Sequence, residues 1–157
     1  MSRVVEIGVA SLPAPQGSFR PMISKSTGKP FLAPSNATGY PRYRADLRAG
    51  AMAALDGHTP MTWAVHLEVT FVLPRPAGHF LPVNTKRPVP ELNPNAPVYP
   101  FGQPDLDKLC RSVLDALTGI VYLDDAQVIH LNAGKVYSDD FAFGGFTKIR
   151  VTGGDHS

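Results

Sequence analysis

Four aspartates in one short stretch are the residues of this sequence most able to do chemistry. Asp105 and Asp107 form a D-x-D pair, and Asp124 and Asp125 follow as a second pair. Carboxylates carry the hard oxygen atoms that Mg²⁺ and Mn²⁺ prefer, and several of them close together stay ionised only beside a counter-charge. If a turn brings the second pair back to the first, the four aspartates predict a divalent metal site.

A metal held in this way can make a hydroxide-like nucleophile from water and stabilise a leaving oxygen, which is the chemistry of phosphodiester hydrolysis. Lys108 and Arg111 lie beside the first pair. Either could hold the scissile phosphate or neutralise the charge that develops on it. Asp115 lies four residues after Arg111, and this helical spacing predicts an ion pair with Arg111 more than a metal ligand.

Each part of this acidic cluster also has a purely structural interpretation. Asp105 is placed to cap a helix, and the Asp124–Asp125 pair would suit a turn. The combination of a D-x-D pair at a helix start with a second acidic pair before a strand favours a functional site. Spacing alone leaves both interpretations open.

The segments around the aspartates have the periodicity of regular elements. Residues 106–118 place apolar side chains at helical spacing, so they predict an amphipathic helix that Gly119 ends. A strand is expected at about 127–136, and a final strand at about 146–151. The first acidic pair should therefore straddle a helix start, and the second should precede a strand.

The N-terminal part predicts the rest of the fold. Alternation of apolar and polar residues predicts a strand at 63–73, and an alanine-rich run predicts a helix at 41–55. A strand at 4–9 is expected before them, and residues 19–23 and 30–33 should form either a hairpin or an ordered loop that carries Lys25 and Lys29. This order of elements predicts an α+β fold, with a mixed or antiparallel sheet and two main helices.

The composition indicates one small domain over residues 1–157, since 43% of the 157 residues are hydrophobic and can form a core. Nine prolines lie between residues 74 and 104, so a long loop is expected there, either functional or a flexible insertion. No apolar run is long enough to span a membrane, and the N-terminus lacks a signal-peptide pattern. Cys110 is the only cysteine, which excludes an internal disulfide. We therefore expect a cytoplasmic protein.

Charge is distributed unevenly along the chain. Residues 1–104 hold ten Lys and Arg against five acidic residues, whereas residues 105–140 hold seven Asp against three basic residues. A polyanion would be attracted by the first part and repelled by the second, unless cations neutralise the aspartates. Two differently solvated surfaces would give the same pattern.

The segment PDLDKLCRSVLDALTG and the later VYLDDAQV resemble the signature of the RusA-type Holliday junction resolvases. That signature runs D-x-D-N-L-x-K, then D-A-L, then D-D-x-Q-V. The resemblance implies a RusA-like nuclease domain and a crossover junction endodeoxyribonuclease of DNA recombination and repair. It also implies a homodimer that binds branched DNA and nicks two strands of a four-way junction with Mg²⁺, for which Mn²⁺ could substitute.

Position by position, the resemblance places the metal-binding aspartates at Asp105, Asp107 and Asp125, with Asp124 adjacent. The essential lysine of the family falls on Arg111, and the asparagine of its motif falls on Lys108. Arginine keeps the positive charge but cannot lose a proton, so phosphate binding is the role that survives at this position. Lys108 could share that role.

DNA contacts are expected to fall on basic residues that bind phosphates, with a steep dependence on salt. The candidates are Lys25, Lys29, Arg42, Arg44, Arg48, Lys86, Arg87 and Lys135.

Other functions compete with the nuclease. A branched-DNA-binding module that has lost its nuclease activity would also fit, and Arg111 is the feature that favours it. A glycosyltransferase could use D-L-D to hold a metal and a diphosphate sugar, although 157 residues are few for such a fold. A phosphatase of the haloacid dehalogenase type would need its D-x-D after a buried strand, whereas a proline-rich stretch precedes it here.

Overall fold

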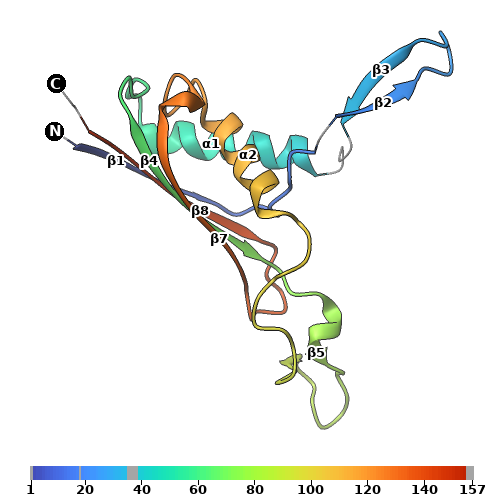
Figure 1. Cartoon of the computed structure of the whole chain (residues 1–157). Coiled ribbons are helices and arrows are strands. Elements are labelled where there is room, and N and C mark those ends of the chain that lie inside the picture. The colour runs from blue at the N-terminus through green and yellow to red at the C-terminus, as the bar shows by residue number, and fades with distance from the viewer. Residues whose placement is uncertain (1, 18, 35–38, 155–157) are drawn as a thin grey trace.

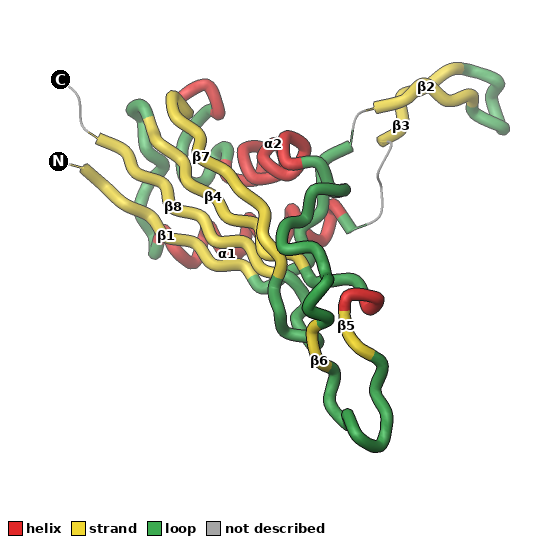
Figure 2. The backbone as a smooth tube through the Cα atoms, turned by 60° about the horizontal axis from the view of Figure 1, so that its bottom comes forward, coloured by secondary structure: helices red, strands yellow, loops and turns green. Residues whose placement is uncertain are grey.

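A mixed four-stranded sheet runs through the fold, and both long helices lie on one of its faces (Figures 1 and 2). The computed structural model describes residues 2–17, 19–34 and 39–154. The strands are β1 (Ser2–Val9), β2 (Phe19–Ile23), β3 (Pro30–Pro34), β4 (Val65–Leu73), β5 (Phe80–Leu81), β6 (Glu91–Leu92), β7 (Val128–Tyr137) and β8 (Phe146–Gly154). The helices are α1 (Tyr40–Leu55) and α2 (Leu106–Leu117), with the 3-10 turns η1 (Ala77–His79) and η2 (Asp125–Gln127). The α+β prediction is confirmed.

The order of strands in the sheet is β1-β8-β4-β7. β8 pairs antiparallel with both β1 and β4, whereas β4 and β7 run parallel. A parallel pair needs a long crossover connection. Here that crossover contains the proline-rich segment, α2 and η2. Every aspartate of the acidic cluster therefore belongs to the connection that joins β4 to β7.

The core lies between the sheet and the two helices. In β4 the predicted alternation is present, with buried residues from Val65 to Leu73 at every second position. α1 turns Leu47 and Ala51 toward the core, and α2 contributes Leu109 and Val113. Burial of these apolar faces fixes how the two helices lie on the sheet.

Two arginines, Arg48 and Arg75, connect separate parts of the fold through hydrogen bonds to backbone carbonyls. Arg48 of α1 donates to the carbonyl oxygens of Ala116 (3.1 Å) and Thr118 (3.4 Å), where the C-terminal end of α2 leaves its last carbonyls without helical partners. Arg75, just after β4, donates to the carbonyl of Pro97 (2.6 Å). This contact holds the far side of the proline-rich segment against the end of the sheet.

Two hairpins extend from this body (Figures 1 and 2). β2 and β3 form the one that carries the turn with Lys25 and Lys29. β5 and β6 form a much shorter pair inside the proline-rich segment. Neither helix of the described residues has the length and hydropathy needed to cross a lipid bilayer.

A serine ties the chain after β1 to α2. Ser112 is fully buried in α2, and its Oγ donates to the carbonyl of Ala14 (2.8 Å). The same Oγ accepts the backbone N–H of Gln16 (2.7 Å). Since both partners belong to the segment that leads into the β2–β3 hairpin, one hydroxyl group fixes that segment against the helix that carries Asp107.

Ser112→Ala should therefore lower the free energy of unfolding by about 1–3 kcal/mol, because the Ala14 carbonyl loses its buried donor and the Gln16 N–H keeps only its 3.3 Å bond to the Lys108 carbonyl. Urea denaturation followed by circular dichroism measures the change. The matched control is Ser138→Ala, which removes an exposed hydroxyl that accepts a single bond from the Asp140 N–H. Equal stabilities of the two variants would show that Ser112 is not an anchor.

Candidate functional site

The first acidic pair lies at the start of α2. Asp105 is the N-cap residue, with an extended backbone, and Asp107 lies in the first turn. The expectation that Asp105 caps the helix through its side chain is wrong, because its carboxylate accepts no bond from the helix N-terminus. It instead forms an ion pair with the amine of Lys108, at 3.2 Å. Lys108 is thus engaged with a carboxylate of the acidic cluster.

Lys135 of β7 holds the chain just before this helix. Its amine donates to the carbonyl oxygen of Pro104 (2.9 Å) and also to that of Gly102. This tertiary contact joins β7 to the chain just before α2 and helps to fix where the helix begins. Lys135 therefore acts within the fold as a positioning residue for the first acidic pair.

The second acidic pair lies in a turn whose geometry is set by Gln127. The carboxylate of Asp124 accepts the N–H of Ala126 (2.8 Å) and so caps η2. Oε1 of Gln127 accepts the N–H groups of Leu123 (2.8 Å) and Asp124 (2.9 Å), which completes a reciprocal capping box.

The amide group at the other end of the Gln127 side chain reaches across to the chain before β4. Its Nε2 donates to the carbonyls of Met61 (3.0 Å) and Trp63 (2.8 Å). One side chain thus makes four hydrogen bonds and holds the turn in place. This role was missed by sequence reasoning, although the D-D-x-Q spacing was the signal that pointed to it.

The two acidic elements converge on one open cavity of about 730 Å³. Asp107, Arg111 and Asp115 reach it from α2, and Asp125 reaches it from η2. Its lining is Leu106, Asp107, Cys110, Arg111, Leu114, Asp115, Asp125, Leu131 and Ala133. We call this the acidic cavity. Three carboxylates and one guanidinium therefore face the same space from two elements that are separate in the sequence.

Asp115 takes a different position from the one its spacing indicated. Within the described ranges, no ion pair joins it to Arg111, so that expectation is wrong. Asp115 and Asp125 instead line the acidic cavity together, and both also line a second hollow of about 400 Å³ beside it. Asp124, Tyr40 and Arg44 belong to this second hollow. Positions 107, 111 and 115 share one helix face, which was the available signal.

Crowding of the carboxylates changes the protonation of Asp125. A hydrogen bond with the Asp124 side chain raises the pKa of the Asp125 carboxyl above its usual value, and desolvation and the charges of Asp124 and Asp115 act in the same direction. These neighbours favour the neutral form because a second negative charge nearby is unfavourable. A cation in the cavity would have the opposite effect on that pKa.

Among the residues that the structure describes, no three Asp, Glu, His or Cys side chains form a ready-made metal cage. Asp105 does not line the acidic cavity, and Asp124 lines only the neighbouring hollow. Mg²⁺ nevertheless needs few protein ligands, since it keeps several waters and commonly binds one or two carboxylates plus substrate phosphate. The oxygen donors of Asp107, Asp115 and Asp125 fit that demand.

Some of the predicted DNA-binding residues are exposed to solvent, and others contact groups of the protein itself. Lys25 and Lys29 lie exposed at the turn of the β2–β3 hairpin, and Lys86 is exposed in the proline-rich segment. Arg87 pairs with Glu91 at 3.5 Å. Arg44 lies in the hollow beside the acidic cavity. These residues come from widely separated parts of the fold.

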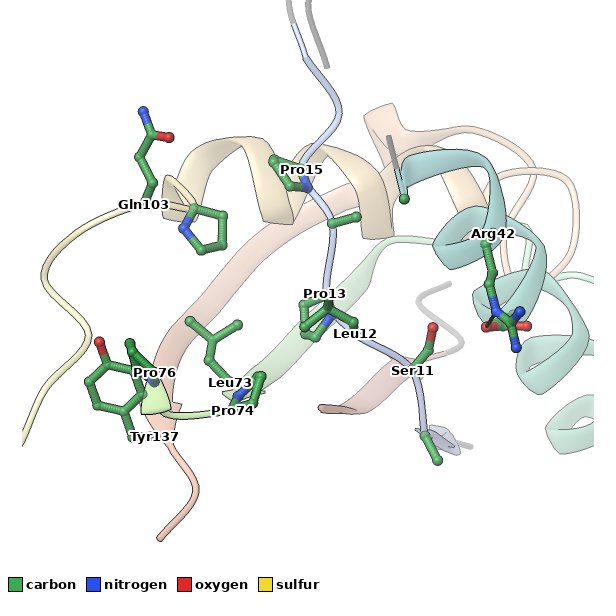
Figure 3. Close-up of a pocket in the computed structure, with 15 residues that line it drawn as sticks. Ser11, Leu12, Pro13, Pro15, Arg42, Leu73, Pro74, Pro76, Gln103 and Tyr137 are labelled. Carbon is green, nitrogen blue, oxygen red and sulfur yellow. Dashed lines mark ion pairs between the residues drawn. The ribbon is translucent and has the colours of Figure 1, made fainter. Parts of the chain in front are cut away.

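The other predicted contacts have partners in the fold. Arg48 and Lys135 hold backbone carbonyls at the two ends of α2. Arg42 forms an i,i+4 pair with Asp46 at 3.8 Å. It lies at one side of a largely apolar cavity of about 860 Å³ (Figure 3). That cavity holds none of the four predicted aspartates, so we do not assign it the chemistry.

Two comparisons with known proteins identify relatives of this chain. Residues 13–144, most of the chain, match the profile of a family described as Endodeoxyribonuclease RusA. The chain is also similar to the uncharacterized protein YqaN of Bacillus subtilis (strain 168), with 30% identity over 82 residues. That similarity covers 52% of this chain and 55% of YqaN, so it spans about half the length of the relative.

Gln127→Ala should lower the free energy of unfolding by about 1–3 kcal/mol. It removes the partner of two N–H groups in the turn and of two carbonyls in the chain before β4. For a chain of this size, each 1 kcal/mol corresponds to a fall in Tm of about 2–4 °C. Differential scanning calorimetry measures the change in Tm. Gln103→Ala, at an exposed position, is the control, and a Tm shared by both variants would contradict the role given to Gln127.

Proposed function

Because the chain belongs to the endodeoxyribonuclease RusA family, we propose that it is a Mg²⁺-dependent nuclease that resolves Holliday junctions and related branched DNA. The single observation that carries this proposal is the acidic cavity, which Asp107, Asp115, Asp125 and Arg111 line together. Carboxylates and a guanidinium around one space suit a metal and a phosphate together.

The proposed ligands of Mg²⁺, or of Mn²⁺ in its place, are Asp107 and Asp125, with Asp105 and Asp124 as neighbouring carboxylates. Asp115 joins this set because it lines the same cavity. Asp105 joins it when Lys108 releases its carboxylate. Mg²⁺ held there would supply Lewis-acid stabilisation of the phosphate and ease deprotonation of the attacking water.

Arg111 is the residue we propose to hold the scissile phosphate. Its side chain lines the acidic cavity, and within the described part of the chain no hydrogen bond or ion pair occupies its guanidinium. Lys108 already pairs with Asp105. A planar guanidinium can bind two phosphate oxygens at once and offset the charge that builds up on them during cleavage.

The arms of the junction are proposed to lie along the exposed cations. Lys25, Lys29 and Lys86 project from the two hairpins, and Arg44 adjoins the acidic cavity. Contacts of this kind position DNA through its phosphates. Resolution of a four-way junction requires two cuts, for which we propose a homodimer, and sedimentation equilibrium of the purified chain measures that state.

A binding module without nuclease activity is the second candidate, because the family lysine is replaced by Arg111. The glycosyltransferase alternative has no support from the family match. The haloacid dehalogenase alternative has none from the fold, because Asp105 and Asp107 open a helix and do not follow a buried strand.

A labelled synthetic four-way junction should be cut by the purified chain with Mg²⁺ and left intact with EDTA. Asp107→Asn should reduce cutting at least about 100-fold, since even outer partners of metal ligands are worth 10- to 100-fold. It should keep or strengthen junction binding, because it removes a charge that repels phosphate. Gel assays of cutting and binding measure both.

The matched control is Asp56→Asn, at the C-cap of α1, where the backbone is left-handed and asparagine is well tolerated. It should cut normally. Binding without cutting in the parent chain would favour the module, and absence of any preference for the junction over duplex would exclude both candidates. Normal cutting by Asp107→Asn would show that the proposed ligands are wrong.

Arg111→Met should reduce cutting about 100-fold, the usual effect of removing one group that stabilises transition-state charge. Lys108→Met should reduce it much less, because Lys108 is paired with Asp105. Arg111→Lys restores the charge and should recover most of the activity. Single-turnover cleavage rates measure the series. A larger loss from Lys108→Met than from Arg111→Met would reverse the two assignments.

A further inference from the structure

An unusually exposed apolar segment leads into the site helix. The exposed fractions of Val98, Tyr99 and Phe101 are 69%, 71% and 88%. Among the described residues, no large apolar side chain is more exposed than Phe101. Single exposed apolar residues are common on protein surfaces, whereas three within four positions beside a candidate site indicate a surface that contacts something. We call residues 98–101 the aromatic segment.

The aromatic segment is held at both ends by cations of the body. On one side, Arg75 donates to the carbonyl of Pro97 (2.6 Å), and its own guanidinium is fixed by Asp139 (2.9 Å). On the other side, Lys135 donates to the carbonyls of Gly102 and Pro104. Between these anchors the segment, yellow in Figure 1, forms an open loop before α2.

A tight turn fixes the backbone between the two aromatic residues. The N–H of Phe101 donates to the carbonyl of Tyr99 (3.0 Å). A backbone that is anchored at both ends and turned in the middle loses little further entropy when a ligand binds. The fold thus presents the Phe101 ring in solvent on a backbone that is already ordered.

The position of Phe101 along the chain limits its distance from the site. It precedes Leu106, which lines the acidic cavity, by five residues, and a chain spans at most about 3.6 Å per residue, so the two Cα atoms lie within about 18 Å. Bases along a DNA strand repeat every 3.4 Å or so. A ring at this position therefore lies within about five nucleotide steps of the rim of the acidic cavity.

A nucleobase at a branch point is the ligand that suits an exposed ring here. In continuous duplex both faces of each base are covered by stacking, whereas the terminal pairs at a crossover can expose a face. Aromatic side chains stack on such faces whatever the base. The exposed Lys86 in the same proline-rich segment adds attraction for phosphate.

We propose that Phe101, with Tyr99 beside it, stacks on an unpaired or unstacked base at the branch point and so helps the protein to favour branched DNA over duplex. This inference rests on the proposed function, since it needs branched DNA at the acidic cavity. It assigns a role in substrate selection to a segment that carries no acidic or basic residue.

The test compares the full chain with Phe101→Ala and Phe101→Trp, in EDTA so that the DNA stays whole. The DNA is a four-way junction with 2-aminopurine next to the branch point, and the reference is a duplex of the same strand. Phe101→Ala should weaken junction binding roughly 5- to 150-fold, the range for loss of one stacked base. Its duplex affinity should stay within about twofold of that of the parent, because no phosphate contact is removed.

Phe101→Trp should restore junction affinity, and the change in 2-aminopurine fluorescence on binding should be present with Phe and Trp and absent with Ala. Val89→Ala, another exposed apolar residue of the proline-rich segment, should bind like the parent. Melting temperatures of all variants should agree, since the Phe101 side chain is in solvent.

The outcomes separate this inference from the proposed function. If the parent prefers and cuts the junction and Phe101→Ala binds it equally well, the stacking role is overturned and the nuclease assignment stands. Equal losses on junction and duplex, or failure of Phe101→Trp to restore binding, also overturn stacking. Self-association of the parent that depends on Phe101 without DNA would identify a protein contact instead. A parent chain that binds the junction no better than the duplex would contradict the proposed function itself.

Discussion

Repulsion between carboxylates is the constraint around which this structure is arranged. Asp107, Asp115 and Asp125 line one cavity, and the crowded pair at the turn already raises the pKa of Asp125. Like charges separate unless something holds them together. Here the restraint comes from hydrogen bonds outside the cavity: Lys135 fixes the approach to α2, and Gln127 fixes the turn. These contacts keep the three carboxylates around one cavity.

Basic residues have two different roles in this fold, and the sequence does not show which residue has which role. Arg48, Arg75 and Lys135 each donate to backbone carbonyls, and they join α1 to α2, the proline-rich segment to the sheet, and β7 to the helix start. The exposed lysines of the hairpins have no such task among the contacts of the described residues. A count of basic residues therefore overstates the number available for phosphate.

The sequence predicted the elements well, because their signals are local. Alternation in β4 and helical spacing in α2 follow directly from which side chains must be buried. The parallel pairing of β4 with β7 could not be predicted, because an apolar pattern does not specify strand direction. The spacing of Asp115 allowed two interpretations, a pair with Arg111 or a place beside Asp107 on the same helix face, and only the tertiary neighbour Asp125 distinguishes them. The capping bonds of Gln127 are local, whereas its bonds to Met61 and Trp63 and those of Lys135 span 31 residues or more, which no local pattern encodes.

The crossover between β4 and β7 also links assembly of the site to completion of the fold. Both acidic elements lie within this one connection, and their relative position depends on the contacts that Gln127 and Lys135 make with other parts of the fold. A nascent or partly unfolded chain would therefore carry dispersed aspartates with little affinity for a divalent ion. Assembly of the acidic cavity is therefore coupled to folding, because local unfolding that frees either acidic element would separate its carboxylates from those of the other.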